Sequence, residues 1–491
     1  MALVLTLAVI SVFAPTCAIR SDIRPIGDVV REFGYDMEAH TIHTSDGYML
    51  TTHRLLGRSR EQTHAEPVVL VEGMLQSSAS NLAKGKGIAY SLVDQGFDVW
   101  LTNYRGNLYS RQHETISPDS PAFWNFTLHE MGTKDLPATI DYVLTHTQHN
   151  QLIYLGFSMG TTMFWVLASS LPQYQNKVSV MVAVDPVARP SNMRLLKNDF
   201  SRTTIYALFK TLWTLKKCEV MSYGDTTSSI LSRLCSGKFR FTCERFVDKM
   251  NRFQKEEMEV DAAFKMIPYS PAGISVKVIL HFIQIACAKR FQQFDYGSRG
   301  NRQMYGSTQP PQYDLQRIQL PVYLVYSDKD KVATKQDIEW LADQLPRRPT
   351  RKIESVRNFS HLDFSLNFDL RALFQFEKYL NLLTAKLSVE KDIRQEEMNS
   401  SFKIQEQTEG EIFALNERIE ALQANLRQRD LSISSVIAEN LDARYDQICD
   451  ARSELIPYLV RYGCQIWNMS RYVIPNLARY RIQIWDQSTF P

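Results

Sequence analysis

A serine between two glycines, Gly156-Phe157-Ser158-Met159-Gly160, is the stretch of this sequence most suited to covalent chemistry. A serine hydroxyl is a poor nucleophile at neutral pH. It needs a base within hydrogen-bond reach, a group that orients the base, and donors for the oxyanion. Glycines two residues before and after the serine allow a sharp strand-to-helix turn that exposes the hydroxyl. The spacing favours a nucleophile at such a turn, and the alternative is an ordinary surface serine between flexible residues.

An acid and a base follow Ser158 in the order that this arrangement requires. The predicted strand in "LPVYLVYSD" leads to Asp328 and Asp330, and the predicted strand Lys352–Val356 leads to His361. His361 is the only one of the ten histidines beyond residue 281. We predict that Ser158 is the nucleophile and His361 the base, with Asp328 or Asp330 as the acid. This chemistry needs no cofactor or metal ion, and none is expected.

The elements that must position these side chains alternate between strands and helices from about residue 67 to residue 356. Short apolar runs typical of buried parallel strands alternate with segments of helical spacing; the runs are "PVVLVEG", "FDVWLTN", "QLIYLGFS" and "VSVMVAVDP". The alternation predicts an α/β fold with a mostly parallel sheet. It stops over residues 187–312, which are helical in character. This insertion is expected to cap the carboxyl ends of the strands, where open α/β sheets bind ligands.

The composition is that of a folded globular protein. Of its 491 residues, 44% are hydrophobic and 22% are charged, and the length predicts two or three folded units. A formal net charge of only +3 gives no sign of a nucleic-acid partner. Residues 1–18 resemble a secretory signal peptide, with an apolar run too short to span a bilayer and a small-residue cleavage site, although no Lys or Arg precedes the run. The alternative is an uncleaved anchor or interfacial helix.

A secretory route permits disulfides and glycans. Cys235 and Cys243 are the preferred pair because they are close in sequence, and Cys449 and Cys464 form a second candidate pair. Four sequons are candidate glycosylation sites, at Asn125, Asn358, Asn399 and Asn468. We therefore expect a secreted or lysosomal protein.

Residues 386–491 differ in composition from the rest of the chain and are predicted to form a helical extension of unknown role. A short heptad seam consists of Ile412, Leu415, Ile419, Leu422 and Leu426. A coiled-coil homo-oligomer and a helical hairpin folded on its own chain both fit this seam. The last part, Ile456–Pro491, interleaves aromatic residues with arginines, which fits either contact with a lipid interface or inward packing.

Several collinear segments resemble the acid lipase family, which includes gastric and lysosomal acid lipases. They are "GYDMEAHTIHTSDGYMLTTHRL", "GFDVWLTNYRGNLYSRQH", "FWNFTLHEMGTKDLPATIDYV", "SPAGISVKVILHFIQ", "FQQFDYG" and "SHLDF". The resemblance covers roughly Ser21 to Leu383. It implies an α/β-hydrolase lipase domain over residues 19–385, with the cap as an insertion.

The resemblance also implies residue roles. It selects Asp330 over Asp328 as the acid, because the family aspartate stands just before a hydrophobic-Ala step. It implies an oxyanion hole formed by the backbone N–H groups of Met74 and Met159. Two departures bear on activity: Glu72 precedes Gly73 where many members have histidine, and Phe157 replaces a polar neighbour of the serine. A carboxylate near the oxyanion would oppose catalysis unless it is protonated or points away.

Two functions from different classes follow. The first is a secretory-pathway lipase that hydrolyses triacylglycerols or cholesteryl esters through an acyl-enzyme at a lipid–water interface. An acyltransferase would use the same three residues with an alcohol in place of water. The second is a catalytically weak or inactive lipid-binding scaffold on the same fold, which the altered oxyanion neighbourhood and the long extension would suit.

Overall fold

The computed structural model describes residues 24–57, 66–221 apart from 86 and 197, 269–346, 351–356, 361, 364 and part of 403–424. The chain divides into two compact units, residues Met1–Leu387 and Ser388–Pro491. Residues 1–18, Cys235, Cys243, Cys449 and Cys464 lie outside the described residues, as do three of the four sequon asparagines, Asn358, Asn399 and Asn468.

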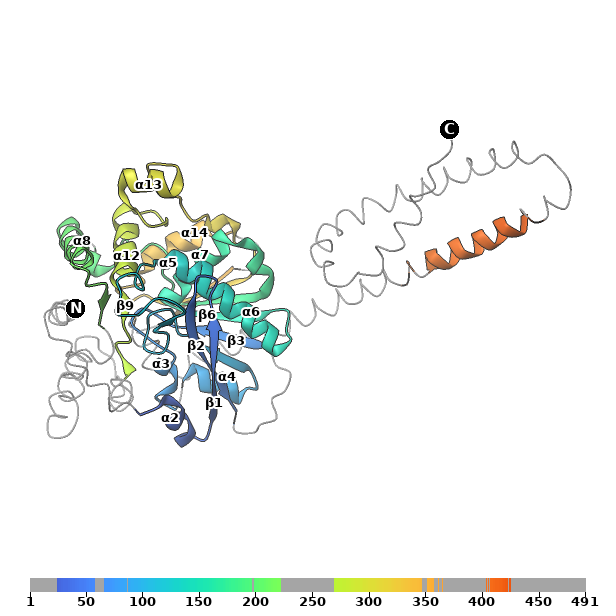
Figure 1. Cartoon of the computed structure of the whole chain (residues 1–491), viewed down its shortest axis with the longest axis horizontal. Helices are drawn as coiled ribbons and strands as arrows, with labels where there is room; N and C mark the ends of the chain where they lie inside the picture. Colours follow the sequence, from blue (N-terminus) through green and yellow to red (C-terminus); the bar gives the residue numbers. More distant parts are fainter. Residues whose placement is uncertain are drawn as a thin grey trace. The chain divides into compact units, whose positions relative to one another are not determined.

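A mixed sheet forms the centre of the first unit (Figure 1). Its strand order is β1-β2-β4-β3-β6-β7-β10-β11, and β5 pairs with β2. The pairs β1–β2 and β2–β4 are antiparallel, whereas the pairs from β4 through β3 to β11 are parallel. The strands are β1 (Asp36–His43), β2 (Tyr48–Leu56), β3 (Pro67–Val71), β4 (Asp98–Leu101), β5 (Gln112–His113), β6 (Leu152–Phe157), β7 (Val178–Val184), β10 (Val322–Ser327) and β11 (Arg351–Val356). The prediction of a mostly parallel sheet is confirmed.

Both faces of the sheet are buried, which explains why its central strands are continuous apolar runs. Successive residues of a strand point to opposite faces, and the two faces form two separate hydrophobic clusters. Val69 and Val71 of β3 belong to one cluster, and Val68 and Leu70 belong to the other. Helices cover both faces: α2 (Ile26–Glu32), α3 (Ala79–Leu82), α4 (Ile88–Asp94), α5 (Leu128–Glu130), α6 (Leu136–Thr147), α7 (Met159–Ser170) and α14 (Lys335–Gln344).

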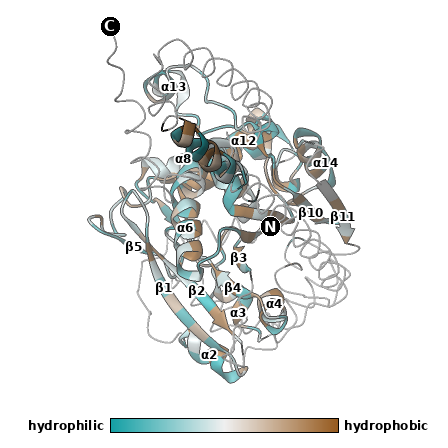
Figure 2. Ribbon diagram, turned by 90° about the vertical axis from the view of Figure 1, so that its right-hand side faces the viewer, coloured by the Kyte–Doolittle hydropathy of each residue, from teal (hydrophilic) through white to brown (hydrophobic). Residues whose placement is uncertain are grey.

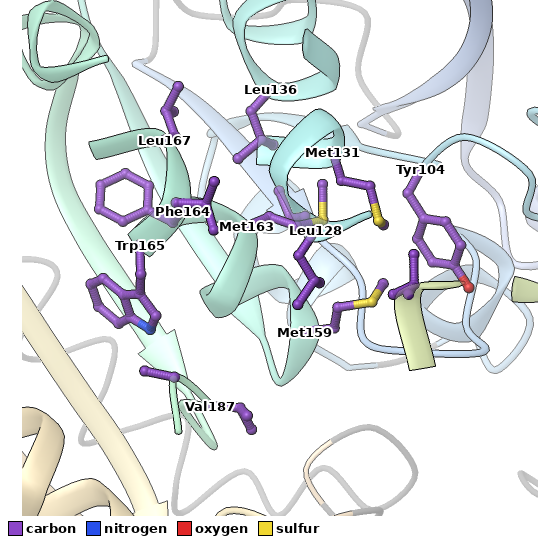
Figure 3. Close-up of a cluster of buried hydrophobic side chains, with 14 of the residues drawn as sticks. Tyr104, Leu128, Met131, Leu136, Met159, Met163, Phe164, Trp165, Leu167 and Val187 are labelled. Carbon is purple, nitrogen blue, oxygen red and sulfur yellow. The ribbon is translucent and has the colours of Figure 1, made fainter. Parts of the chain in front are cut away.

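The helix α7 is the most deeply buried of these helices, with eleven of its twelve residues buried. Figure 3 shows Met159 and Met163 of α7 packed near Leu128 and Met131. Met131 begins a π-helical turn, η1 (Met131–Asp135), that joins α5 to α6. A helix so enclosed is held firmly, and its first residue directly follows Ser158.

The predicted cap lies between β7 and β10. Its described part contains α8 (Asp199–Thr214), α12 (Val276–Ala288) and α13 (Gly297–Tyr305), grouped at one side of the sheet in Figure 1. Helix α8 is amphipathic: it buries Ile205, Phe209 and Leu212 while Phe200 is 82% exposed, and its hydropathy colours alternate in Figure 2. A two-stranded sheet of β8 (Glu219–Val220) and β9 (Ile274–Ser275) adds strands that the sequence did not predict.

In the second unit, the described part of residues 403–424 is helical. Ile412 and Leu422 of the predicted seam are 47% and 59% exposed, and Leu415 and Ile419 are half-buried. The helical character predicted for this segment is therefore present in its described residues.

Candidate active site

Ser158 stands at the turn between β6 and α7, as its flanking glycines predicted. Its φ of 50° and ψ of −113° lie in a region that non-glycine residues rarely adopt, which is typical of strained functional turns. Its N–H donates to the Val184 carbonyl at 3.0 Å, which fixes the turn to the neighbouring strand β7. The helix α7 begins at Met159, directly after the serine.

The two glycines permit a close approach of backbone segments. A Cβ atom on Gly160 would lie 2.4 Å from the Val71 carbonyl oxygen, and one on Gly156 would lie 3.0 Å from backbone atoms of residues 160 and 161. No larger residue fits at Gly160 unless α7 moves away from β3.

Three side chains meet at the carboxyl edge of the sheet. His361 Nε2 lies 2.7 Å from Ser158 Oγ, and His361 Nδ1 lies 2.7 Å from Asp330 Oδ2. The serine, the acid and the imidazole follow β6, β10 and β11, whose carboxyl ends lie at one edge because the strands are parallel. The structure thus brings together the three residues that the sequence singled out.

The Asp330 carboxylate is held on its other oxygen. Oδ1 accepts the backbone N–H groups of Val332 at 2.6 Å and Ala333 at 3.1 Å, which leaves Oδ2 directed at the imidazole. The competing candidate, Asp328, has an exposed side chain that lies 3.7 Å from Lys335 Nζ. Geometry therefore favours Asp330 over Asp328 as the partner of His361.

A fourth side chain, Asp185, reaches the same imidazole. It follows β7 directly, and its Oδ2 lies 3.6 Å from His361 Nδ1 with none of its side chain exposed. The sequence interpretation did not include it. Its position in the sequence could have indicated it, because Asp185 directly follows the apolar strand in "VSVMVAVDP".

The two proposed oxyanion donors lie in the expected elements. Met159 is the first residue of α7, where a helix has no internal acceptor for the N–H group. Met74 lies in the turn after β3. Both neighbouring N–H groups have acceptors: that of Gly73 donates to Gln76 Oε1 at 3.1 Å, and that of Leu75 donates to Tyr104 Oη at 3.1 Å. Within the described part of the chain, no acceptor is recorded for the N–H of Met74.

Glu72 is buried and faces the loop that follows β4. Its carboxylate accepts the Thr102 hydroxyl at 2.5 Å, the Tyr104 N–H at 2.6 Å and the Asn107 amide at 3.1 Å. Burial raises the pKa of Glu72 to about 7, and the Thr102 hydroxyl opposes that rise. The carboxylate thus braces the loop of residues 102–107, so that three donors neutralise part of its charge.

The same loop is anchored by a buried arginine. The guanidinium of Arg105 is 1% exposed, pairs with Asp135 Oδ1 at 2.6 Å and Asp46 Oδ2 at 2.7 Å, and lies 4.0 Å from the centre of the Tyr48 ring. Burial raises the pKa of Asp135 to about 6, and the charge of Arg105 opposes that rise. The pairing joins the β1–β2 turn, the loop after β4 and the start of α6.

Phe157 packs against the imidazole rather than leaving space beside the serine. Its ring centre lies 5.2 Å from that of His361, with the planes 33° apart. A Cβ on Gly73 would lie 2.9 Å from the Phe157 ring. Phe157 therefore fills the space between the turn after β3 and His361.

Other predicted sites are placed as follows. Asn125 is exposed, and its side-chain oxygen accepts Lys277 Nζ at 2.8 Å. Cys218 and Cys287 are free thiols. Among the described residues, two groups gather three potential metal ligands: Glu38, His40 and His146 on β1 and α6, and the cluster of Asp185, Asp330 and His361.

Comparisons with known proteins agree with this architecture. A family described as "alpha/beta hydrolase fold" matches residues 66–367, more than half of the chain, and a "Partial alpha/beta-hydrolase lipase region" matches residues 26–85. Lipase 1 of Drosophila melanogaster is 33% identical over 73% of this chain and 79% of its own length. Human gastric triacylglycerol lipase is 32% identical over 74% of this chain and 94% of its own length. Human lipase member K is 31% identical over 70% of this chain and 87% of its own.

The resemblance inferred from the sequence segments is thereby confirmed over the first unit. The matched regions include the serine turn and the segment that carries His361. The chain belongs to the α/β-hydrolase family, in its acid lipase branch, and is a carboxylic ester hydrolase of the lipase class.

Proposed function

We propose that this lipase cleaves lipid esters through a covalent acyl-enzyme on Ser158, with His361 as general base and Asp330 as its orienting acid. The observation that carries the proposal is the continuous chain of two 2.7 Å contacts from Ser158 Oγ through the imidazole to Asp330 Oδ2. In this order the imidazole takes the hydroxyl proton as oxygen attacks the acyl carbonyl, and the carboxylate holds the ring in the required tautomer.

The acyl-enzyme forms and decays through two tetrahedral intermediates. His361 gives the proton to the leaving alcohol and then removes a proton from water, which attacks the acyl carbonyl. The imidazolium returns that proton to Ser158 Oγ as the bond between this oxygen and the acyl carbon breaks and the fatty acid leaves. The N–H groups of Met74 and Met159 would hold the oxyanion in each step. Their positions after β3 and at the start of α7 support this role. Each such donor typically contributes about 100- to 1,000-fold in rate.

Triacylglycerols are the favoured substrates, and cholesteryl esters are the runner-up. Relatives named as gastric triacylglycerol lipases support this order. The predicted domain organisation, with a cap inserted in the lipase domain, would place an acyl chain beneath the cap. Because the relatives include gastric lipases, we also propose residence in the secretory pathway, secreted or lysosomal. No helix among the described residues has the length and apolarity to span a bilayer.

Covalent labelling tests the mechanism directly. Purified wild-type protein should react with a fluorophosphonate probe, and Ser158→Ala should not. Ser169→Ala is the matched control, because Ser169 is a buried serine in the helix that follows Ser158 and its hydroxyl has no partner among the described residues. It should label like wild type. Equal labelling of wild type and Ser158→Ala would overturn the mechanism.

Hydrolysis assays then separate the substrate classes. Short- and long-chain triacylglycerols and a cholesteryl ester are compared between pH 4 and 8, with Ser158→Ala as the blank. Turnover should exceed the blank for triacylglycerols. A protein that binds these lipids without Ser158-dependent turnover would instead be the catalytically inactive lipid-binding scaffold.

The extension over residues 386–491 is proposed to mediate self-association. The exposed Ile412 and Leu422 on one helical seam support this role, since apolar side chains at such spacing favour a partner helix. Light scattering of the full chain and of residues 19–385 tests it. The full chain should be larger by a whole number of subunits, and equal subunit numbers would exclude the extension as the cause.

A further inference from the structure

We infer that Asp185 is a second carboxylate for the imidazole of His361, a positioning residue that supports the base beside Asp330. The inference rests on the proposed serine mechanism and adds a residue to it. It concerns the charge that develops on the imidazole when the serine proton is removed.

The geometry puts both carboxylates on one side of the ring. Asp330 Oδ2 and Asp185 Oδ2 lie 2.7 Å and 3.6 Å from the same nitrogen, Nδ1, while Nε2 contacts Ser158 Oγ. Neither carboxylate has any exposed side-chain area, and that of His361 is 13% exposed. The imidazole thus has the nucleophile on one nitrogen and two shielded acids on the other.

The backbone holds Asp185 in this place. It is the first residue after β7, the strand between that of the serine and that of Asp330. Its N–H donates to the Val325 carbonyl of β10 at 2.8 Å, and the preceding carbonyl, of Val184, accepts the Ser158 N–H at 3.0 Å. Its φ of 45° is uncommon for a side chain other than Asn or Asp. Two neighbouring strands and a backbone conformation that suits an aspartate therefore direct this carboxylate at the base.

The effect of a second carboxylate on the rate depends on where the serine proton goes. When Ser158 Oγ attacks the acyl carbon, its proton moves to His361 Nε2 and the ring becomes an imidazolium. The Nδ1 proton stays on the ring and is donated to Asp330, so neither carboxylate is protonated in the step. The new positive charge then faces the Asp330 carboxylate at 2.7 Å and the shielded Asp185 side chain at 3.6 Å from the same nitrogen. A negative charge on Asp185 would lower the energy of the charged transition state beyond what Asp330 achieves alone.

The distances also predict redundancy. The two carboxylates differ by 0.9 Å in their approach to Nδ1, since 3.6 minus 2.7 Å is 0.9 Å. If Asp330 lost its charge, a small rotation of the ring would let Nδ1 donate to Asp185. A triad that loses its only acid typically loses about 10,000-fold in kcat. This one should lose far less, until both acids are removed.

The test is a double-mutant cycle in the full chain with a short-chain ester. Asp330→Asn should lower kcat by roughly 10- to 100-fold, Asp185→Asn by less than about tenfold, and the double variant by about 10,000-fold. The Michaelis constant should stay constant, because the carboxylates act on the charged transition state and not on substrate binding. Asn suits the positive φ of Asp185, and Asp185→Gly provides a second variant that the same backbone accepts.

Controls separate this role from a structural one. Asp328→Asn removes an exposed carboxylate from the Asp330 loop, so kcat should stay unchanged in both backgrounds. Thermal unfolding establishes that each variant is folded. A 10,000-fold loss in Asp330→Asn alone, or equal effects of Asp185→Asn with and without Asp330, would overturn the inference while leaving the serine mechanism intact. Loss of Ser158-dependent turnover in wild type would overturn the mechanism itself.

Discussion

Replacing Gly160 by alanine is expected to disable the site without touching any reacting group. The added Cβ would lie 2.4 Å from the carbonyl oxygen of Val71 and 3.0 Å from that of Glu72. Both neighbours are backbone atoms of β3 and the turn after it, so no side-chain rotation relieves the contact. The helix α7 must instead move away from β3.

The required displacement can be worked from these contacts. Reaching 3.0 Å, the shortest distance that Cβ atoms tolerate, takes 0.6 Å from the initial 2.4 Å, and reaching ordinary contact at 3.4 Å takes 1.0 Å. Ser158 and Met159 precede Gly160 directly and move with it. Such a shift along the 2.7 Å bond between Ser158 Oγ and His361 Nε2 would lengthen it to about 3.3–3.7 Å, which weakens the hydrogen bond or breaks it. A misplacement of about 1 Å typically costs about 100-fold in rate, and overpacking a core costs about 1–3 kcal/mol of stability.

The assay measures kcat with a short-chain ester, the rate of fluorophosphonate labelling, and the urea unfolding midpoint. Gly156→Ala should have a smaller effect, since its nearest backbone contacts are 3.0 Å. Gly27→Ala is the matched control in helix α2, where the nearest atoms lie 3.5 Å away on a side chain. It should leave kcat unchanged and stabilise by about 0.5–1 kcal/mol. If Gly160→Ala kept wild-type kcat and stability, the described turn could not be what positions the serine.

Three further substitutions probe the surroundings. Glu72→Gln should remove a pH dependence of stability. The pKa of Glu72 is raised from 4.5 to about 7 in the folded state, so the wild type loses about 3 kcal/mol of unfolding free energy as pH rises through that window. The urea unfolding midpoints of the two proteins should therefore diverge between pH 4.5 and 7, and a constant difference over this range would contradict the assignment. Arg105→Met should lower the free energy of unfolding by about 3–5 kcal/mol, because Asp135 stays buried without its cation; an unchanged urea midpoint would refute this. Phe157→Ala should lower kcat by roughly tenfold with a constant Michaelis constant, because the ring that supports His361 is gone; unaltered kinetics would show that the ring has no such role.

The fold was predictable because its signals are local. Buried parallel strands are continuous apolar runs, and the strand-turn-helix at Ser158 needs two glycines at fixed spacing, so both could be identified without distant contacts. The chain order of serine, acid and histidine then placed His361. The choice between Asp328 and Asp330 needed the family resemblance, because what distinguishes them is that the N–H groups of Val332 and Ala333 hold the second oxygen of Asp330.

The features that the sequence could not supply depend on distant partners. The direction of the Glu72 carboxylate is set by donors from residues 102–107, about thirty positions further along the chain. The sequence therefore placed Glu72 near the oxyanion site without indicating which way its carboxylate points. Asp185 was missed for a related reason: one acid was expected, and nothing local indicates that β7 lies between β6 and β10. The strands β8 and β9 have two residues each, too few to carry any periodicity.

The separation of Ser158 from His361 along the chain has a consequence for biosynthesis. The two residues stand 203 positions apart. At a ribosomal rate of roughly 5–20 residues per second, the histidine is made about 10–40 seconds after the serine. A nascent or truncated polypeptide that ends before β11 therefore carries the serine turn without its base. Under the proposed mechanism, ester hydrolysis therefore cannot begin until the segment that carries His361 has been made.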